Sequence, residues 1–154
     1  MASALGPTPI AGIVLLATAT PWHRCYPGFS GWQIRFLITA VTAATRLLGY
    51  YPGDRIGFGG REARTLMRDW LVMAKHNRYS AAGMDQDLEA LVQVGTEPVL
   101  SIYCEHDHFG PLAAIEGVTH RLGRREVTLQ QITSAELGTR ADHVSWAKHP
   151  APPR

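Results

Sequence analysis

The sequence of 154 residues has few cysteines, little net charge and no long apolar run, and each absence argues against a class of protein. Its two cysteines, Cys25 and Cys104, cannot form the framework of a small disulfide-rich protein, so we expect a reducing, cytoplasmic location. Its net charge of +2 is too small to indicate a nucleic-acid or anionic-membrane partner. The apolar run 10–19 is too short to span a bilayer, so we expect no membrane span.

The composition, 45% hydrophobic and 18% charged, indicates one globular domain at this length. Three apolar, β-rich runs predict strands at 12–19, 98–104 and 126–133. No basic residue precedes the first run, and prolines stand directly before it, so a buried parallel strand fits it better than a signal peptide.

The intervening segment, residues 20–88, is rich in aromatic residues and broken by proline and glycine. We expect helices at 34–49 and 61–76, joined by a turn-rich link, and we interpret the whole segment as a helical lid over an apolar pocket. Shorter helices are expected at 84–94 and 110–123, and a final turn at 144–149. The sequence therefore predicts an α/β fold with about three parallel strands and a helical lid insertion. Residues 149–154 are expected to form a Pro-rich tail, and the basic cluster Arg121, Arg124 and Arg125 a solvated helix end.

The stretch "IYCEHDHFGP" ends an apolar strand with four ionisable residues, Glu105, His106, Asp107 and His108. They could bind a metal, supply a catalytic group or form a solvated turn. Functional groups gather beyond the carboxyl ends of strands in open α/β sheets, and the loop after the next strand carries a further histidine, His143. A carboxylate there can orient an imidazole, which then acts as a general base.

The metal alternative would use Cys104, His106, His108 and His143. Their spacing matches no zinc pattern, so we expect no metal and no cofactor.

Two segments resemble the catalytic loops of the α/β-hydrolase family. "CEHDHFGP" is similar to the acid loop, which makes Asp107 the triad acid, and "ADHVSW" is similar to the histidine loop, which makes His143 the base. Cys104 and Asp142 stand where glycines are usual in that family. "TRLLGYYPGDRIGFG", "DWLVMAKHNRY" and "EPVLSIYCEHDHFG" resemble an uncharacterised bacterial subgroup, and this likeness covers nearly all the chain from Ile13 onward.

The family places its nucleophile before the acid, on a Gly-x-Ser-x-Gly elbow between a strand and a helix. These residues contain no such pentapeptide; "GFSGW" around Ser30 is the nearest, with different spacing and no preceding strand. "MASALG" resembles the last turn of the elbow helix. The resemblance thus implies the carboxyl-terminal part of a serine-esterase-type hydrolase that starts just after its nucleophile and is inactive alone.

The alternatives to this interpretation are a non-catalytic interaction module, half of a split protein and, less favoured, a metal-binding protein. The expected partners are a small acyl substrate, an amino-terminal half, or a second copy that associates through an open sheet edge.

Overall fold

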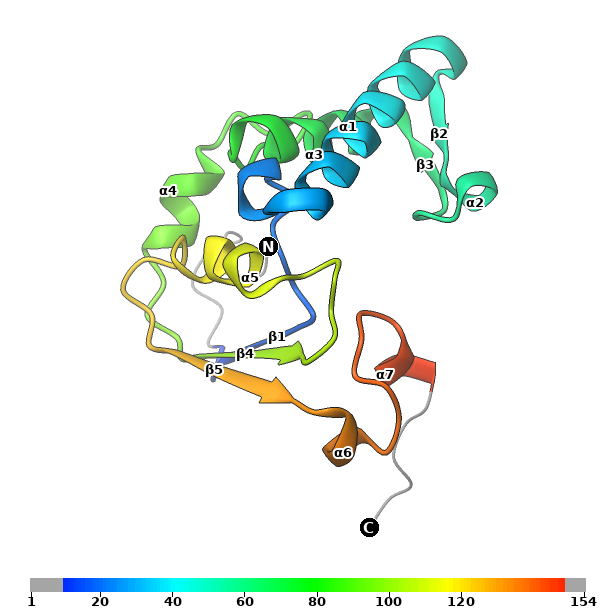
Figure 1. Ribbon diagram of the computed structural model, residues 1–154. Helices are drawn as coiled ribbons and strands as arrows, with labels where there is room; N and C mark the ends of the chain where they lie inside the picture. Colours follow the sequence, from blue (N-terminus) through cyan, green and yellow to red (C-terminus); the bar gives the residue numbers. More distant parts are fainter. Residues whose placement is uncertain (1–9, 149–154) are drawn as a thin grey trace. The chain divides into compact units, whose positions relative to one another are not determined.

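The computed structural model describes residues 10–148, and the chain divides into two compact units (Figure 1). The first unit combines the residues up to Thr20 with those from Ala90 onward, and the second is Pro21–Glu89. The expected Pro-rich tail, 149–154, and the "MASALG" segment lie outside the described residues.

The first unit is built on a three-stranded sheet in the order β1-β4-β5. Its strands are β1 (Ile13–Leu16), β4 (Val99–Cys104) and β5 (Val127–Ile132). Both pairings are parallel, with Ile13 opposite Val99 and Val99 opposite Val127. The predicted α/β class with three parallel strands is therefore confirmed.

The first strand is shorter than the expected 12–19. It stops at Leu16 because Ala17 has φ 47°, in the left-handed region that a regular strand does not use. The Ala17 amide still donates to the Ile102 carbonyl at 2.9 Å, so the chain leaves the sheet beside β4.

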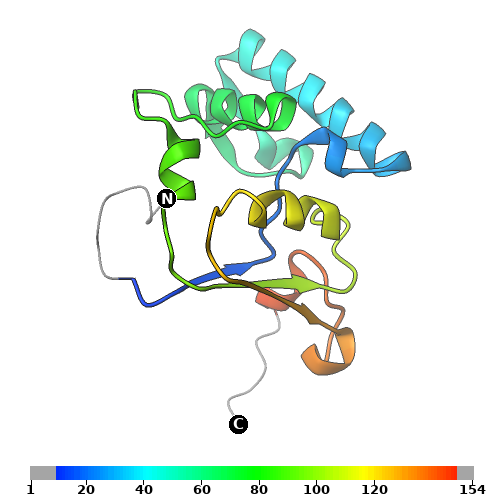
Figure 2. The same ribbon diagram turned by 90° about the vertical axis from the view of Figure 1, so that its left-hand side faces the viewer.

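Helix α5 (Leu112–Thr119) covers one face of the sheet (Figures 1 and 2). It begins after Pro111, which suits the first turn of a helix, and it is shorter than the expected 110–123. Its buried residues are Ala114, Ile115, Val118 and Thr119. Val99 and Ser101 of the central strand are also buried, so the core of this unit lies between α5 and β4.

The structure corrects the interpretation of the basic cluster. Arg124 is exposed, but the side chain of Arg125 is fully buried. The Arg125 guanidinium contacts Glu97 Oε2 at 3.2 Å through both Nε and Nη2, and its Nη1 donates to the carbonyls of Val92 and Leu122. Arg125 therefore ties the segment before β4 to the segment before β5, instead of facing solvent.

Two short helices, α6 (Ser134–Leu137) and α7 (Ser145–Lys148), follow the sheet. Thr133 and Glu136 form a capping box at the start of α6. Helix α4 (Leu88–Gln93) lies where the sequence passes from the second unit to the first, and falls within the expected 84–94.

The second unit contains η2 (His23–Cys25), α1 (Gly28–Leu48), β2 (Tyr50–Pro52), α2 (Gly53–Ile56), β3 (Arg61–Ala63) and α3 (Arg64–His76). Its core is formed by Val41, Tyr51 and Met67. Helix α1 starts earlier than expected, so Ser30 of "GFSGW" lies in its first turn, and Gly49 ends it at φ 74°, as expected.

The link expected to be only turns contains a hairpin, in which Tyr50 pairs with Ala63 and Pro52 with Arg61. Whether this unit acts as a lid stays a prediction. Within residues 10–148 no helix is both long enough and apolar enough to cross a membrane.

Candidate active site

The loop after β4 fixes the carboxylate of Asp107. Its side chain is completely buried, and Oδ1 accepts hydrogen bonds from the amides of Phe109 at 2.9 Å and Gly110 at 2.8 Å. An aspartate that binds the amides two and three residues later is typical of a tight turn. Because the turn holds Oδ1, Oδ2 is left to face the loop after β5.

Hydrogen bonds join the loops that follow β4 and β5. The His106 amide donates to the Ala141 carbonyl at 2.8 Å, and the Glu105 carboxylate accepts from the Ser134 amide at 3.0 Å. Ser134 Oγ in turn accepts from the Ala141 amide at 3.1 Å. These bonds place the histidine loop against the acid loop.

Asp107 and His143 meet between these loops. Asp107 Oδ2 lies 2.8 Å from His143 Nδ1, so the two residues that the sequence places after neighbouring strands are within one hydrogen bond of each other. A carboxylate only accepts hydrogen bonds, so Nδ1 carries the proton and Nε2 is the basic nitrogen. In residues 10–148 no hydrogen-bond partner is found for Nε2, and the His143 side chain is 38% exposed.

Several groups set the basicity of His143. The hydrogen bond that Nδ1 donates to Asp107 raises the pKa of His143 above its ordinary value, and the negative charges of Asp107 and Asp142 add to this effect. Partial burial opposes it, because burial disfavours the charged imidazolium. The Phe109 ring lies beside the imidazole with 5.7 Å between ring centroids and covers part of it. This arrangement can accept a proton at Nε2 while Asp107 holds the ring orientation and stabilises the imidazolium.

Asp142 has a role that the sequence analysis missed. Its Oδ1 accepts from the amides of Val144 at 3.0 Å and Ser145 at 2.8 Å, and its Oδ2 accepts from the Ser145 hydroxyl at 2.9 Å. These bonds lower the pKa of Asp142 to about 2. Asp142 thus caps the turn that contains His143; an aspartate just before a short helical turn is the signal that indicates such a cap.

Gly110 was also missed. A Cβ atom at this buried position would lie 3.0 Å from Asp107 Oδ2 and 3.3 Å from the Ala19 Cβ. Glycine therefore lets the backbone approach the carboxylate closely enough to donate its amide. The tight turn after Asp107 is the only sequence signal for this requirement.

The other candidates do not join the pair. His106 and His108 are exposed, and His106 lies 3.6 Å from Glu105. In the described part of the chain no group of three or more His, Cys, Asp or Glu side chains is placed to hold a metal ion. Burial raises the pKa of the Cys104 thiol, and the charges of Asp107 and Asp142 add to this, so Cys104 stays protonated and a poor nucleophile.

No family model and no curated protein matches the chain. Two solved structures from Mycobacterium tuberculosis are similar to it. One, from strain H37Rv, is BpoC, proposed to be a non-heme bromoperoxidase, with a TM-score of 0.46 and 16% identity over 96% of this chain and 56% of that one. The other is Rv0554, with a TM-score of 0.44 and 18% identity over 96% of this chain and 54% of that one. This chain thus spans little more than half the length of either. It is an α/β protein whose parallel sheet carries Asp107 and His143 beyond the carboxyl ends of neighbouring strands.

Proposed function

We propose that this chain supplies the acid and the base of an α/β-hydrolase of the serine-esterase type, which cleaves acyl esters through an acyl-enzyme. The observation that carries this proposal is the 2.8 Å contact between Asp107 Oδ2 and His143 Nδ1, with Oδ1 held by two backbone amides. The contact leaves Nε2 as the only ring nitrogen able to take a proton from a nucleophile.

The nucleophile is proposed to come from a Gly-x-Ser-x-Gly segment outside these 154 residues, on the same polypeptide or on a partner chain. Within the sequence the other nucleophile candidates are poorly suited. Cys25 is buried, Ser30 lies in the first turn of α1, which follows a 3-10 turn and not a strand, and Cys104 is buried with a raised thiol pKa. The substrate class is taken from the family resemblance, because an acid–base pair serves many reactions.

The test compares the chain alone with the chain fused to, or co-expressed with, a segment that carries the elbow serine. The coding sequence upstream of Met1 is the first source to try. The chain alone should hydrolyse p-nitrophenyl butyrate no faster than buffer, and the completed protein should turn it over. His143→Ala should then reduce turnover by a factor on the order of 10³ or more, because triad members act as a unit.

His108→Ala is the matched control, since His108 is exposed in the same loop as Asp107 and should leave turnover unchanged. Ester hydrolysis by the chain alone that survives His143→Ala would contradict the proposal and point to Cys25, Ser30 or Cys104.

A second candidate function, association through the sheet, is favoured by β1. Among the strands of residues 10–148 this strand pairs only with β4, and Val14 within it is 66% exposed. The register places Val14, Leu100 and Thr128 side by side on one face of the sheet. An apolar strand at a sheet edge offers unpaired backbone groups to another strand.

We expect the isolated chain to self-associate through β1, as measured by size-exclusion chromatography with light scattering. Val14→Lys should lower the apparent mass, because an edge lysine disfavours strand addition. Thr128→Lys, on the strand at the opposite edge, is the control. A wild-type chain that stays monomeric across the accessible concentration range would exclude this function.

A further inference from the structure

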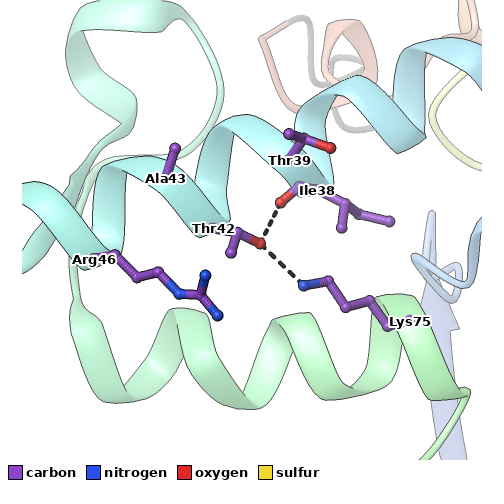
Figure 3. A pocket seen from close by; sticks show the side chains of 6 residues that line it. All are labelled: Ile38, Thr39, Thr42, Ala43, Arg46 and Lys75. Atoms are coloured by element: carbon purple, nitrogen blue, oxygen red, sulfur yellow. Dashed lines mark hydrogen bonds between the residues drawn. The ribbon is translucent and has the colours of Figure 1, made fainter.

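The second unit contains a basic groove between α1 and α3. Two adjoining hollows, of about 340 and 410 Å³, share Thr42 and Arg46 from α1 and Lys75 from α3. Figure 3 shows Arg46 and Lys75 reaching from the two helices into the space between them, where Lys75 Nζ donates to Thr42 Oγ1 at 3.1 Å. The larger hollow is also lined by Arg64 and Arg68.

Arg46, Arg64, Arg68 and Lys75 are four cations that no described acidic side chain pairs with. No ion pair joins Arg46, Arg64, Arg68 or Lys75 to a carboxylate within the part of the chain that the structure describes. Three acids of the same unit accept hydrogen bonds from backbone amides. Glu62 accepts from Gly60, Asp69 from Ala82, and Glu89 from Tyr79.

Two of the four cations, Arg64 and Arg68, are placed unfavourably for their charge, whereas Arg46 and Lys75 lie in the last turns of their helices, where the helix dipole favours cations. Arg64 and Arg68 are four residues apart on α3, a spacing at which like charges repel. Arg64 is the first residue of that helix, where the helix dipole favours acidic side chains, yet the first turn has no acidic residue and no side-chain cap. An anion in the groove would reduce the repulsion between Arg64 and Arg68. It would also supply negative charge at the start of α3, where the first turn has no acidic residue.

The walls of the groove indicate what such an anion carries. Ile38 is buried, Leu71 and Val72 are half-buried, and all three line the hollows beside the cations. Apolar walls next to arginines suit an organic group attached to a compact anion, and a single guanidinium can donate two parallel hydrogen bonds to phosphate oxygens.

We propose that the α1–α3 groove binds the phosphate of a small organic phosphate ester, with Arg64, Arg68 and Lys75 of α3 on one side of the phosphate, Arg46 of α1 on the other, and the organic group against Leu71 and Val72. This site is separate from the proposed hydrolase pair, because all its residues belong to the second unit.

The test uses isothermal titration of the full chain at low salt with phenyl phosphate, inorganic phosphate and benzoate. Phenyl phosphate should bind saturably and more tightly than inorganic phosphate, and benzoate should not bind measurably. If phenyl phosphate and inorganic phosphate bind equally well, the groove is a phosphate site, but the organic group does not contribute to binding. Raising the salt concentration should weaken binding, since exposed charges are screened.

Arg68→Gln and Arg46→Gln should each weaken phenyl phosphate binding about tenfold, as expected for the loss of one charge-assisted contact. Arg68→Lys should keep part of the affinity. Arg35→Gln is the matched control, because Arg35 is exposed on α1 but lines neither hollow. Circular dichroism should show that every variant is folded, and Arg68→Gln should melt slightly higher without ligand, since it removes the repulsion with Arg64.

Three results would overturn the proposal: no binding of either phosphate compound at low salt, equal losses in Arg68→Gln and Arg35→Gln, or binding to RNA or anionic vesicles that phenyl phosphate does not compete for. None of them would bear on Asp107 and His143, so failure here is distinguishable from failure of the proposed hydrolase function.

Discussion

Replacing Asp107 separates its two tasks, which are to hold the turn after β4 and to orient His143. Asp107→Ala removes the acceptor for the amides of Phe109 and Gly110 and for His143 Nδ1. The bond to the Gly110 amide is buried, and an unsatisfied buried donor costs about 1–3 kcal/mol. The Phe109 amide and the partly exposed imidazole can form hydrogen bonds with water instead, so losing their bonds to Asp107 costs less stability. We expect Asp107→Ala to lower the free energy of unfolding by about 2–4 kcal/mol.

Asp107→Asn keeps an oxygen for the two amides but loses the charge, so it should cost only about 1 kcal/mol. Its main effect falls on His143. Without the carboxylate, partial burial becomes the leading influence, so the pKa of His143 should drop to or below its ordinary value of 6.5.

The raised pKa of His143 also makes stability depend on pH. Its folded-state pKa lies above the unfolded value, so its contribution is fully present below about pH 6.5 and is lost as the pH rises through the folded-state pKa. The Asn variant should not show this loss.

The assays are an NMR titration of the seven histidines, with His143→Gln to assign the signal, and guanidinium unfolding below and above neutral pH. Identical His143 titrations in the wild type and in Asp107→Asn would refute the reasoning. So would an Ala variant as stable as the Asn variant.

Three further predictions follow from contacts in the same unit. Gly110→Ala should lower the free energy of unfolding by about 1–3 kcal/mol, because its Cβ would crowd the Asp107 carboxylate, and should lower the pKa of His143 in the same titration; an unchanged pKa would contradict the contact. The pKa of Asp142 is lowered from 3.8 to about 2, so its hydrogen bonds to the following turn should persist above pH 4 and be lost as the pH falls toward 2. Amide hydrogen exchange of Ser145 should report this loss, and Asp142→Ala should show no such pH dependence. Arg125→Ala should lower the melting temperature markedly, because it leaves Glu97 without its buried partner. Arg124→Ala, at an exposed neighbouring position, is the control and should not lower it. Similar melting temperatures of the two variants would show that the buried guanidinium contributes little to stability.

The parallel sheet was predictable because its strands are short apolar runs with turn residues on both sides. The ends of the strands were less predictable, since they depend on single backbone conformations such as the left-handed Ala17. The β2–β3 hairpin was hidden because its strands have three residues each and include Pro52, in a segment where glycine and proline indicate turns.

The contact between Asp107 and His143 was predictable from topology alone, because the carboxyl ends of neighbouring parallel strands meet at one edge of a sheet. The cap at Asp142 and the close approach at Gly110 each have a weak sequence signal, but the contacts that require these residues are seen only in the folded loops. Arg125 was misjudged for a similar reason. Its partners, Glu97 and the carbonyl of Val92, lie far away in sequence, so it looked like its solvated neighbours.

The position of β1 has a consequence for how the chain acquires its structure during synthesis. Ile13 pairs with Val99, so the whole second unit emerges from the ribosome between two partner strands. Bringing distant strands together costs loop-closure entropy, about 0.6 kcal/mol for each doubling of the connecting length, and delays such contacts. We therefore expect the unit 21–89 to fold first, which shortens the flexible chain between β1 and β4. Until β4 has been synthesised, the apolar strand β1 stays unpaired. During that interval the unpaired β1 is accessible to chaperones and prone to aggregation.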